Sequence, residues 1–145
     1  MKNLFFLKPT ALALMVVNTH AQLIWVNEFH YDNTGGDVGE FVEIVAPSTF
    51  TDLSTITLTL YNGSGGASYG THRLNTFTAG ATSDGYTFYS KGFSSTLQNG
   101  APDGFALDQS GTVLQFLSYE GTFQATSGAA NGLTTSDIGV AESDP

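Results

Sequence analysis

The chain has 145 residues, a formal net charge of −9 at pH 7 and no cysteine. This length fits one domain plus a targeting segment. The acidic charge repels phosphate backbones and argues against a nucleic-acid-binding domain, while it suits solubility or the binding of divalent cations. The lack of cysteine excludes disulfide bonds.

The first 21 residues predict a secretory signal peptide. Lysines precede a short apolar run at residues 11–17, and a small-residue site ends at Ala21. The alternative is a buried or membrane-anchoring helix, but the run is shorter than the roughly 20 residues that cross a bilayer. We therefore expect a secreted or periplasmic protein. Its mature domain, residues 22–145, has a formal charge of −11 because two lysines are lost.

The stretch from Ile24 to Val45 predicts a β-hairpin, because two apolar runs flank an acidic, glycine-rich loop. Strand side chains alternate between faces. If Ile24 and Ile44 point into a core, the same face carries Glu28, His30 and Glu40 near the loop, where a carboxylate needs a partner. An extra residue would reverse this parity and put Glu43 in place of Glu40.

Alternation places four aromatic residues on the opposite face of the hairpin. If the core covers one face only, they form an exposed surface for protein or carbohydrate contact. The alternative is that a loop or a following domain covers them as well. The predicted contact surface consists of Trp25, Phe29, Tyr31 and Phe41.

The acidic loop suggests a calcium site, because carboxylate and amide oxygens are the ligands that calcium prefers. The spacing does not match an EF-hand loop. The alternative, which we favour, is a solvated turn whose Asx side chains cap its own backbone. The candidate calcium ligands are Glu28, Asp32, Asn33, Asp37, Glu40 and Glu43.

Catalysis by this chain is not expected. Glu28 and His30 could form an acid–base pair, but no nucleophile motif of the Gly-x-Ser-x-Gly kind is present. A cross-strand pair between His30 and Glu40 is the simpler interpretation.

The rest of the chain predicts short strands separated by turns, with no sustained helical period. The clearest is the alternating segment 54–61, with Ile56, Leu58 and Leu60 facing in and Thr57 and Thr59 facing out. Other candidate strands are 71–77, 86–90, 105–108 and 112–119. Residues 121–145 read as polar loop, with Leu133, Ile138 and Val140 as its apolar anchors. This pattern favours an all-β, immunoglobulin-like antiparallel β-sandwich.

Several of these segments resemble the bacterial form of the lamin-tail domain, an immunoglobulin-like β-sandwich. The segments that carry the resemblance are residues 27–33, 39–44, 58–63, 97–107 and 113–121. It covers nearly the whole mature chain. Members of this family usually continue into a further apolar strand, so the resemblance implies a sandwich that lacks its last strand and has an unpaired edge.

In that family the domain often stands near the N-terminus of secreted proteins whose catalytic part is a metal-dependent nuclease of the endonuclease/exonuclease/phosphatase type. The resemblance therefore implies a non-catalytic accessory module that contacts a protein domain or a cell-surface component. One alternative is a fragment of such a nuclease without its catalytic domain. Another is a stand-alone adhesion or structural protein stabilised by calcium.

Overall fold

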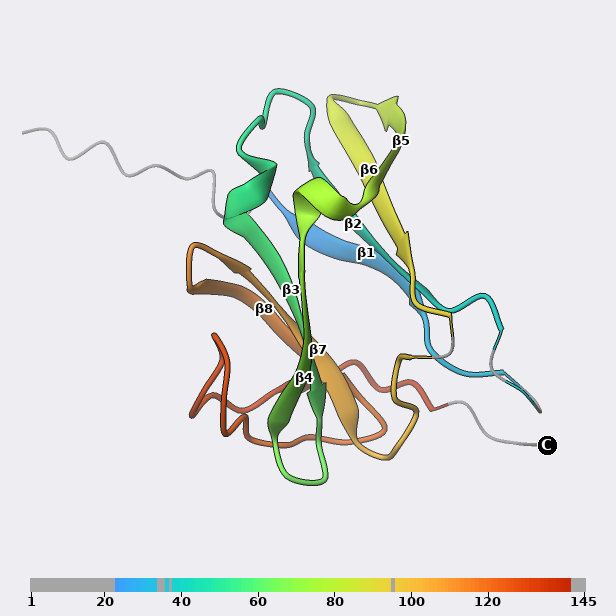
Figure 1. Ribbon diagram of the computed structural model, residues 1–145, viewed down its shortest axis with the longest axis vertical. Coiled ribbons are helices and arrows are strands. Elements are labelled where there is room, and N and C mark those ends of the chain that lie inside the picture. The colour runs from blue at the N-terminus through green and yellow to red at the C-terminus, as the bar shows by residue number, and fades with distance from the viewer. Residues whose placement is uncertain (1–22, 34–35, 37, 95, 142–145) are drawn as a thin grey trace, which may run out of the picture.

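The computed structural model describes residues 23–33, 36, 38–94 and 96–141, which form two β-sheets packed face to face (Figure 1). The four-stranded sheet has the order β1 (Trp25–His30), β2 (Phe41–Pro47), β6 (Tyr86–Gly92) and β5 (Thr78–Ser83). The five-stranded sheet has the order β4 (Ala67–Arg73), β3 (Ile56–Asn62), β7 (Asp103–Gln109), β8 (Thr112–Tyr119) and β9 (Ser136–Asp137). The predicted all-β sandwich is confirmed.

Neighbouring strands are antiparallel except at one edge, where β9 pairs in parallel with β8 over two residues. The helical segments among the described residues are two single 3₁₀ turns, η2 (Leu53–Thr55) and η3 (Leu74–Thr76). This agrees with a sequence that has no helical period and many turn residues. Residues 1–21, the predicted signal peptide, lie outside the described residues.

The main core lies between the two sheets and comes from alternate residues of their strands. Val42 and Ile44 of β2 are fully buried against Ile56 and Leu58 of β3. The inward side of β3 is therefore as predicted, but its outward side is not. Thr59 is almost fully buried although it was expected to face solvent. The reason is that the outer face of the five-stranded sheet is itself covered.

A second hydrophobic cluster forms on that outer face, where residues 122–133 cross the five-stranded sheet (Figure 1). We call residues 122–133 the covering segment. It is held by the backbone N–H of Thr126, which donates to Gly66 O at 2.7 Å, and by that of Ala130, which donates to the Tyr61 hydroxyl at 3.2 Å. The cluster consists of Tyr61, Ala106, Phe116, Phe123, Ala125 and Ala130.

The expected apolar anchors of the C-terminal part are wrong. Leu133 and Val140 are each 46 % exposed and Ile138 is 37 % exposed, whereas Phe123 and Ala130 are buried. Alanine gives little apolar signal in a sequence, but close packing against the rings of the sheet favours a small side chain at Ala130.

Most strand predictions are confirmed. The predicted segment 112–119 coincides with β8, and the segments 86–90 and 105–108 lie within β6 and β7. The expected strand at 71–77 is displaced, because β4 ends at Arg73 and η3 follows it. Strand β5 was not predicted, since all its residues are exposed and it lacks an alternating apolar pattern.

Candidate functional site

A β-bulge in β1 decides which hairpin residues reach each face. Val26 lies opposite Ile44, but Glu28 lies opposite Glu43, so Asn27 is the extra residue. One extra residue reverses the parity of everything after it. Beyond Asn27 the side chains therefore lie on the faces opposite to those that strict alternation predicts.

The bulge divides the four aromatic residues of the predicted contact surface, and the face assigned to two of them is corrected. Phe29 packs against the main core, with its ring centroid 5.0 Å from that of Phe105. Tyr31 is 2 % exposed and stacks on Tyr119 at 3.9 Å. These two residues therefore lie on the core side of the sheet and not on its outer face.

Trp25 and Phe41 remain on the outer face of the four-stranded sheet, as predicted. Trp25 lies edge-to-face with Tyr86 at 5.2 Å, and Phe41 stacks on His30 at 6.4 Å. Tyr86 and Phe88 of β6, which are not part of the predicted contact surface, join them there. Their contribution could have been found by aligning 86–90 as a strand beside the hairpin and reading its outward residues.

We call this surface the aromatic face. At its centre Val45, only 1 % exposed, lies opposite Trp25 on β1 and opposite Phe88 on β6. The surrounding rings are half-buried. Both hydrophobic clusters of the described residues lie elsewhere, one between the sheets and one under the covering segment. The aromatic face consists of Trp25, Phe41, Val45, Tyr86 and Phe88.

The candidate calcium ligands do not gather at one point in the described part of the chain. Asp32 Oδ1 accepts hydrogen bonds from the Asn33 backbone N–H at 2.7 Å and from Asn99 Nδ2 at 3.2 Å. Asn33 Oδ1 accepts from the Val38 N–H at 2.8 Å. The bonds from the N–H groups of Asn33 and Val38 are backbone capping of the kind that the alternative interpretation describes. Asp37 lies outside the described residues.

The three glutamates of the predicted ligand set are separated by the sheet. Glu28 and Glu43 lie opposite each other on the outer face, where Glu43 accepts a hydrogen bond from Asn27 Nδ2 at 2.9 Å, whereas Glu40 is buried. Among the described residues no three acidic or histidine side chains are grouped so that they could hold a metal ion.

Glu40 is a buried carboxylate, as the alternation of β2 predicts. Its Oε2 accepts a hydrogen bond from the Leu97 N–H at 3.1 Å, and its backbone carbonyl accepts from the Phe93 N–H at 3.0 Å. Oε1 has no hydrogen-bond partner. The predicted cross-strand pair with His30 is wrong, because the bulge places His30 opposite Phe41 on the other face. Glu40 instead holds the segment that follows β6.

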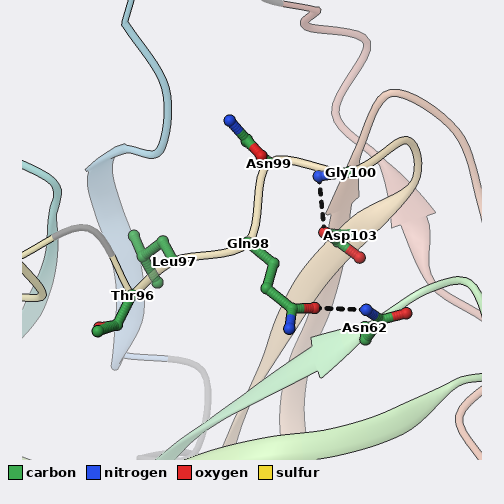
Figure 2. A pocket seen from close by; sticks show the side chains of 7 residues that line it. All are labelled: Asn62, Thr96, Leu97, Gln98, Asn99, Gly100 and Asp103. Carbon is green, nitrogen blue, oxygen red and sulfur yellow. Dashed lines mark hydrogen bonds between the residues drawn. The ribbon is translucent and has the colours of Figure 1, made fainter. Parts of the chain in front are cut away.

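That segment borders an open pocket of about 570 Å³ at one end of the sandwich (Figure 2). Gln98 Oε1 accepts from Asn62 Nδ2 at 2.5 Å. Asp103 accepts from the N–H groups of Gly63 at 2.8 Å and Gly100 at 2.9 Å. Burial raises the pKa of the Asp103 carboxyl. The pocket is lined by Asn62, Thr96, Leu97, Gln98, Asn99, Gly100 and Asp103.

Two tyrosines bind the backbone of Gln98, in the segment that borders the pocket. The Tyr69 hydroxyl accepts from the Gln98 N–H at 3.0 Å, and the Tyr119 hydroxyl donates to the Gln98 carbonyl. Burial raises the pKa of Tyr69 to about 12 and also raises the pKa of Tyr119. Both phenols are therefore neutral at physiological pH and act as hydrogen-bonding supports.

Comparisons with protein-family models, with curated proteins and with solved structures gave no match to this chain. Within the described ranges no helix is long and apolar enough to cross a membrane. The fold defines the class of the protein as a two-sheet β-sandwich.

Proposed function

We propose that the chain is a non-catalytic β-sandwich module of lamin-tail type. It makes contact with a protein or cell-surface component as the N-terminal accessory domain of a larger exported protein. The observation that carries this proposal is the aromatic face. Its rings are half-buried around Val45, and the described residues form no hydrophobic cluster over it.

A surface of this composition is suited to association. Aromatic side chains provide a large contact area with few rotatable bonds, so little conformational entropy is lost when a partner orders them. Trp25 and Tyr86 already constrain each other by their edge-to-face contact. The surface is therefore largely preorganised, which lowers the cost of binding.

His30 lies beside the aromatic face, because its ring stacks on Phe41, and the exposed Glu28 follows the bulge on the same outer face. Export and membership of a larger protein rest on the predicted signal peptide and on the lamin-tail resemblance.

The single tryptophan of the chain gives a direct test, because Trp25 lies on the aromatic face. We expect acrylamide to quench the indole fluorescence readily in the isolated chain. Addition of the natural partner, or fusion to the following domain of the parent protein, should protect the indole and shift its emission to shorter wavelength. An indole that resists quenching in the isolated chain would mean that this face is already covered, and the proposal would fail.

Substitution separates binding from folding. Trp25→Ala and Phe88→Ala should weaken partner binding strongly, as expected for central aromatic anchors. Leu133→Ala is the matched control, because Leu133 is an exposed apolar residue outside the aromatic face. Partner binding measured by surface plasmon resonance that is equal in all three variants would contradict the proposal.

A further inference from the structure

The edges of the two sheets meet along one side of the sandwich and leave a groove between them. One wall is β1, the edge strand of the four-stranded sheet. The other is the segment after β9, where the Ile138 N–H donates to Ser118 O at 2.9 Å and Val140 O accepts from Glu120 N–H at 3.1 Å. The groove has a volume of about 340 Å³ and is lined by Asn27, Glu28, Phe29, Tyr31, Ile138 and Val140.

The backbone of β1 is oriented for pairing on this side. The Val26 N–H points away from β2, because it donates to the Gln115 side chain at 2.7 Å. Val26 lies opposite Ile44 of β2. Phe29 lies opposite Val42, which is two residues from Ile44 on the same strand. Since backbone groups alternate in direction along a strand, the N–H and C=O of Phe29 also point to the open edge. The Val26 N–H is already satisfied by Gln115, so an extended segment can add to β1 only beyond the bulge, where it would pair with Phe29.

The side chains specify what such a segment carries. Residues of an added strand alternate between the two faces of the sheet. Those facing inward would meet Phe29, Ile138 and Val140, the last of which is 46 % exposed. Those facing outward would lie beside Glu28, which is exposed on the outer face of β1. Inward positions thus favour apolar side chains, and outward positions favour lysine or arginine.

We propose that this groove binds an extended segment of a partner protein in which apolar and basic residues alternate, and that the segment pairs with β1. Charge separates this occupant from a second copy of the chain. The net charge is −9, and the basic residues of the described ranges, Arg73 and Lys91, do not line the groove. Two copies would therefore repel each other at this edge. The groove is distinct from the aromatic face, so the inference goes beyond the proposed function.

The test uses fluorescein-labelled synthetic peptides of about nine residues, the length of a long strand. The first alternates valine and lysine. The second has the same composition with the valines and lysines in blocks. The third replaces alternate valines by proline, which cannot donate to a strand ladder. Fluorescence anisotropy should show that the first peptide binds the chain, and that the other two bind at least about tenfold more weakly.

Four variants locate the site. Val140→Arg and Glu28→Lys should each weaken binding of the alternating peptide about tenfold. Leu133→Arg and Asp52→Lys make the same changes at exposed positions away from the groove and should bind as the parent chain does. Because Glu28 is exposed, Glu28→Lys keeps the test valid even if Val140→Arg does not fold.

Three results of the binding assay would overturn the proposal. They are no binding of the alternating peptide at millimolar concentration, equal binding of the alternating and block peptides, and equal binding by Glu28→Lys and Asp52→Lys. A stable dimer in sedimentation that the peptide does not dissociate would also overturn it, because a second copy would then occupy the edge. The Trp25→Ala variant should bind the peptide normally, so failure here is distinguishable from failure of the aromatic face.

Discussion

The outer faces of the two sheets differ in what covers them. Both outer faces carry aromatic residues, Tyr61 and Phe116 on the five-stranded sheet and Trp25 and Phe88 on the four-stranded sheet. On the first the chain supplies its own cover, residues 122–133. On the second, no described segment forms a hydrophobic cluster over the rings. The difference teaches that an outward aromatic residue on a sheet is a packing element or a binding element according to what covers it.

The outer face of the five-stranded sheet shows how the covering segment packs. Phe123 packs edge-to-face on Phe116 at 5.5 Å, and the buried Ala125 and Ala130 belong to the same hydrophobic cluster. Burying an aromatic side chain contributes roughly 1.5–3 kcal/mol. The rings of the aromatic face are half-buried, so part of that free energy is still available for association with a partner.

The largest expected effect comes from removing an aromatic ring beneath the covering segment. Phe116→Ala should lower the free energy of unfolding by about 3–5 kcal/mol, because it leaves a cavity beneath the covering segment. Phe88→Ala on the aromatic face should cost clearly less, since solvent can fill the space. Urea denaturation of the two variants measures the difference. Equal losses would mean that the two faces are packed alike and that the comparison is wrong.

The second prediction concerns a substitution that should loosen the covering segment without replacing an aromatic residue. A Cβ atom at Gly128, whose φ is +67°, would lie 2.5 Å from the Tyr61 hydroxyl oxygen. Gly128→Ala should therefore destabilise the fold by more than the roughly 1 kcal/mol that a left-handed backbone alone costs.

Gly132→Ala is the matched control for this variant. Its φ is +82°, but nothing lies within 4 Å of an added Cβ atom. It should cost only the backbone contribution. Hydrogen exchange of the covering segment, measured by mass spectrometry, should rise in Gly128→Ala and stay low in Gly132→Ala. The reverse ranking would show that the contact with Tyr61 does not hold the cover.

The sequence predicts much of this architecture, because alternation is a strong signal where one side of a strand is buried. Ile56, Leu58 and Leu60 identify the inner side of β3, and the segment 112–119 identifies β8. Alternation does not predict the second hydrophobic cluster, on the outer face of the five-stranded sheet. Tyr61 and Thr59 face away from the main core and are buried all the same, because a distant segment covers them. A pattern within one strand contains no information about that cover.

The hairpin shows a second limit of prediction from sequence. The bulge at Asn27 moves Phe29 and Tyr31 into the core and His30 to the outer face. The sequence allows for a bulge but does not say where the extra residue falls, because the bulge position depends on cross-strand packing. The hairpin itself is therefore predicted correctly, but two of the four aromatic residues of the predicted contact surface lie on the other face.

A third prediction uses the hydroxyl of Tyr61 under the cover. Burial raises its pKa, and it accepts a hydrogen bond from the Ala130 N–H at 3.2 Å. Tyr61→Phe should cost about 0.5–1.5 kcal/mol at neutral pH, because one hydrogen bond is lost. The unfolded chain releases this proton near pH 10 while the folded chain retains it, so stability falls as pH rises above about 10.

The pH dependence of the melting temperature tests this prediction. Between pH 9 and pH 11 the melting temperature of Tyr61→Phe should fall less steeply than that of the parent chain. Tyr69→Phe should have a similar effect on the slope, because the pKa of Tyr69 is raised to about 12. Parallel curves for the parent chain and Tyr61→Phe would indicate that the covering segment does not exclude solvent from this hydroxyl.

The smallest expected effect concerns His72 on β4, at the edge of the five-stranded sheet. Burial lowers its pKa, and the nearby charge of Lys91 lowers it further. The unfolded chain therefore binds this proton at a higher pH than the folded chain, so the contribution of His72 to stability is present at neutral pH and is lost as pH falls below about 6.5.

His72→Gln should flatten the decline in melting temperature between pH 7 and pH 5, and Lys91→Met should flatten it partly, because the charge is the lesser cause. His72 packs edge-to-face on Phe93 at 5.1 Å, at the start of the segment that Glu40 holds. Protonation of His72 should therefore loosen this end of the sandwich before the covered face, and hydrogen exchange at pH 5 should rise first around Phe93. An earlier rise in residues 122–133 would contradict this prediction, because the covering segment would then open before the region around Phe93.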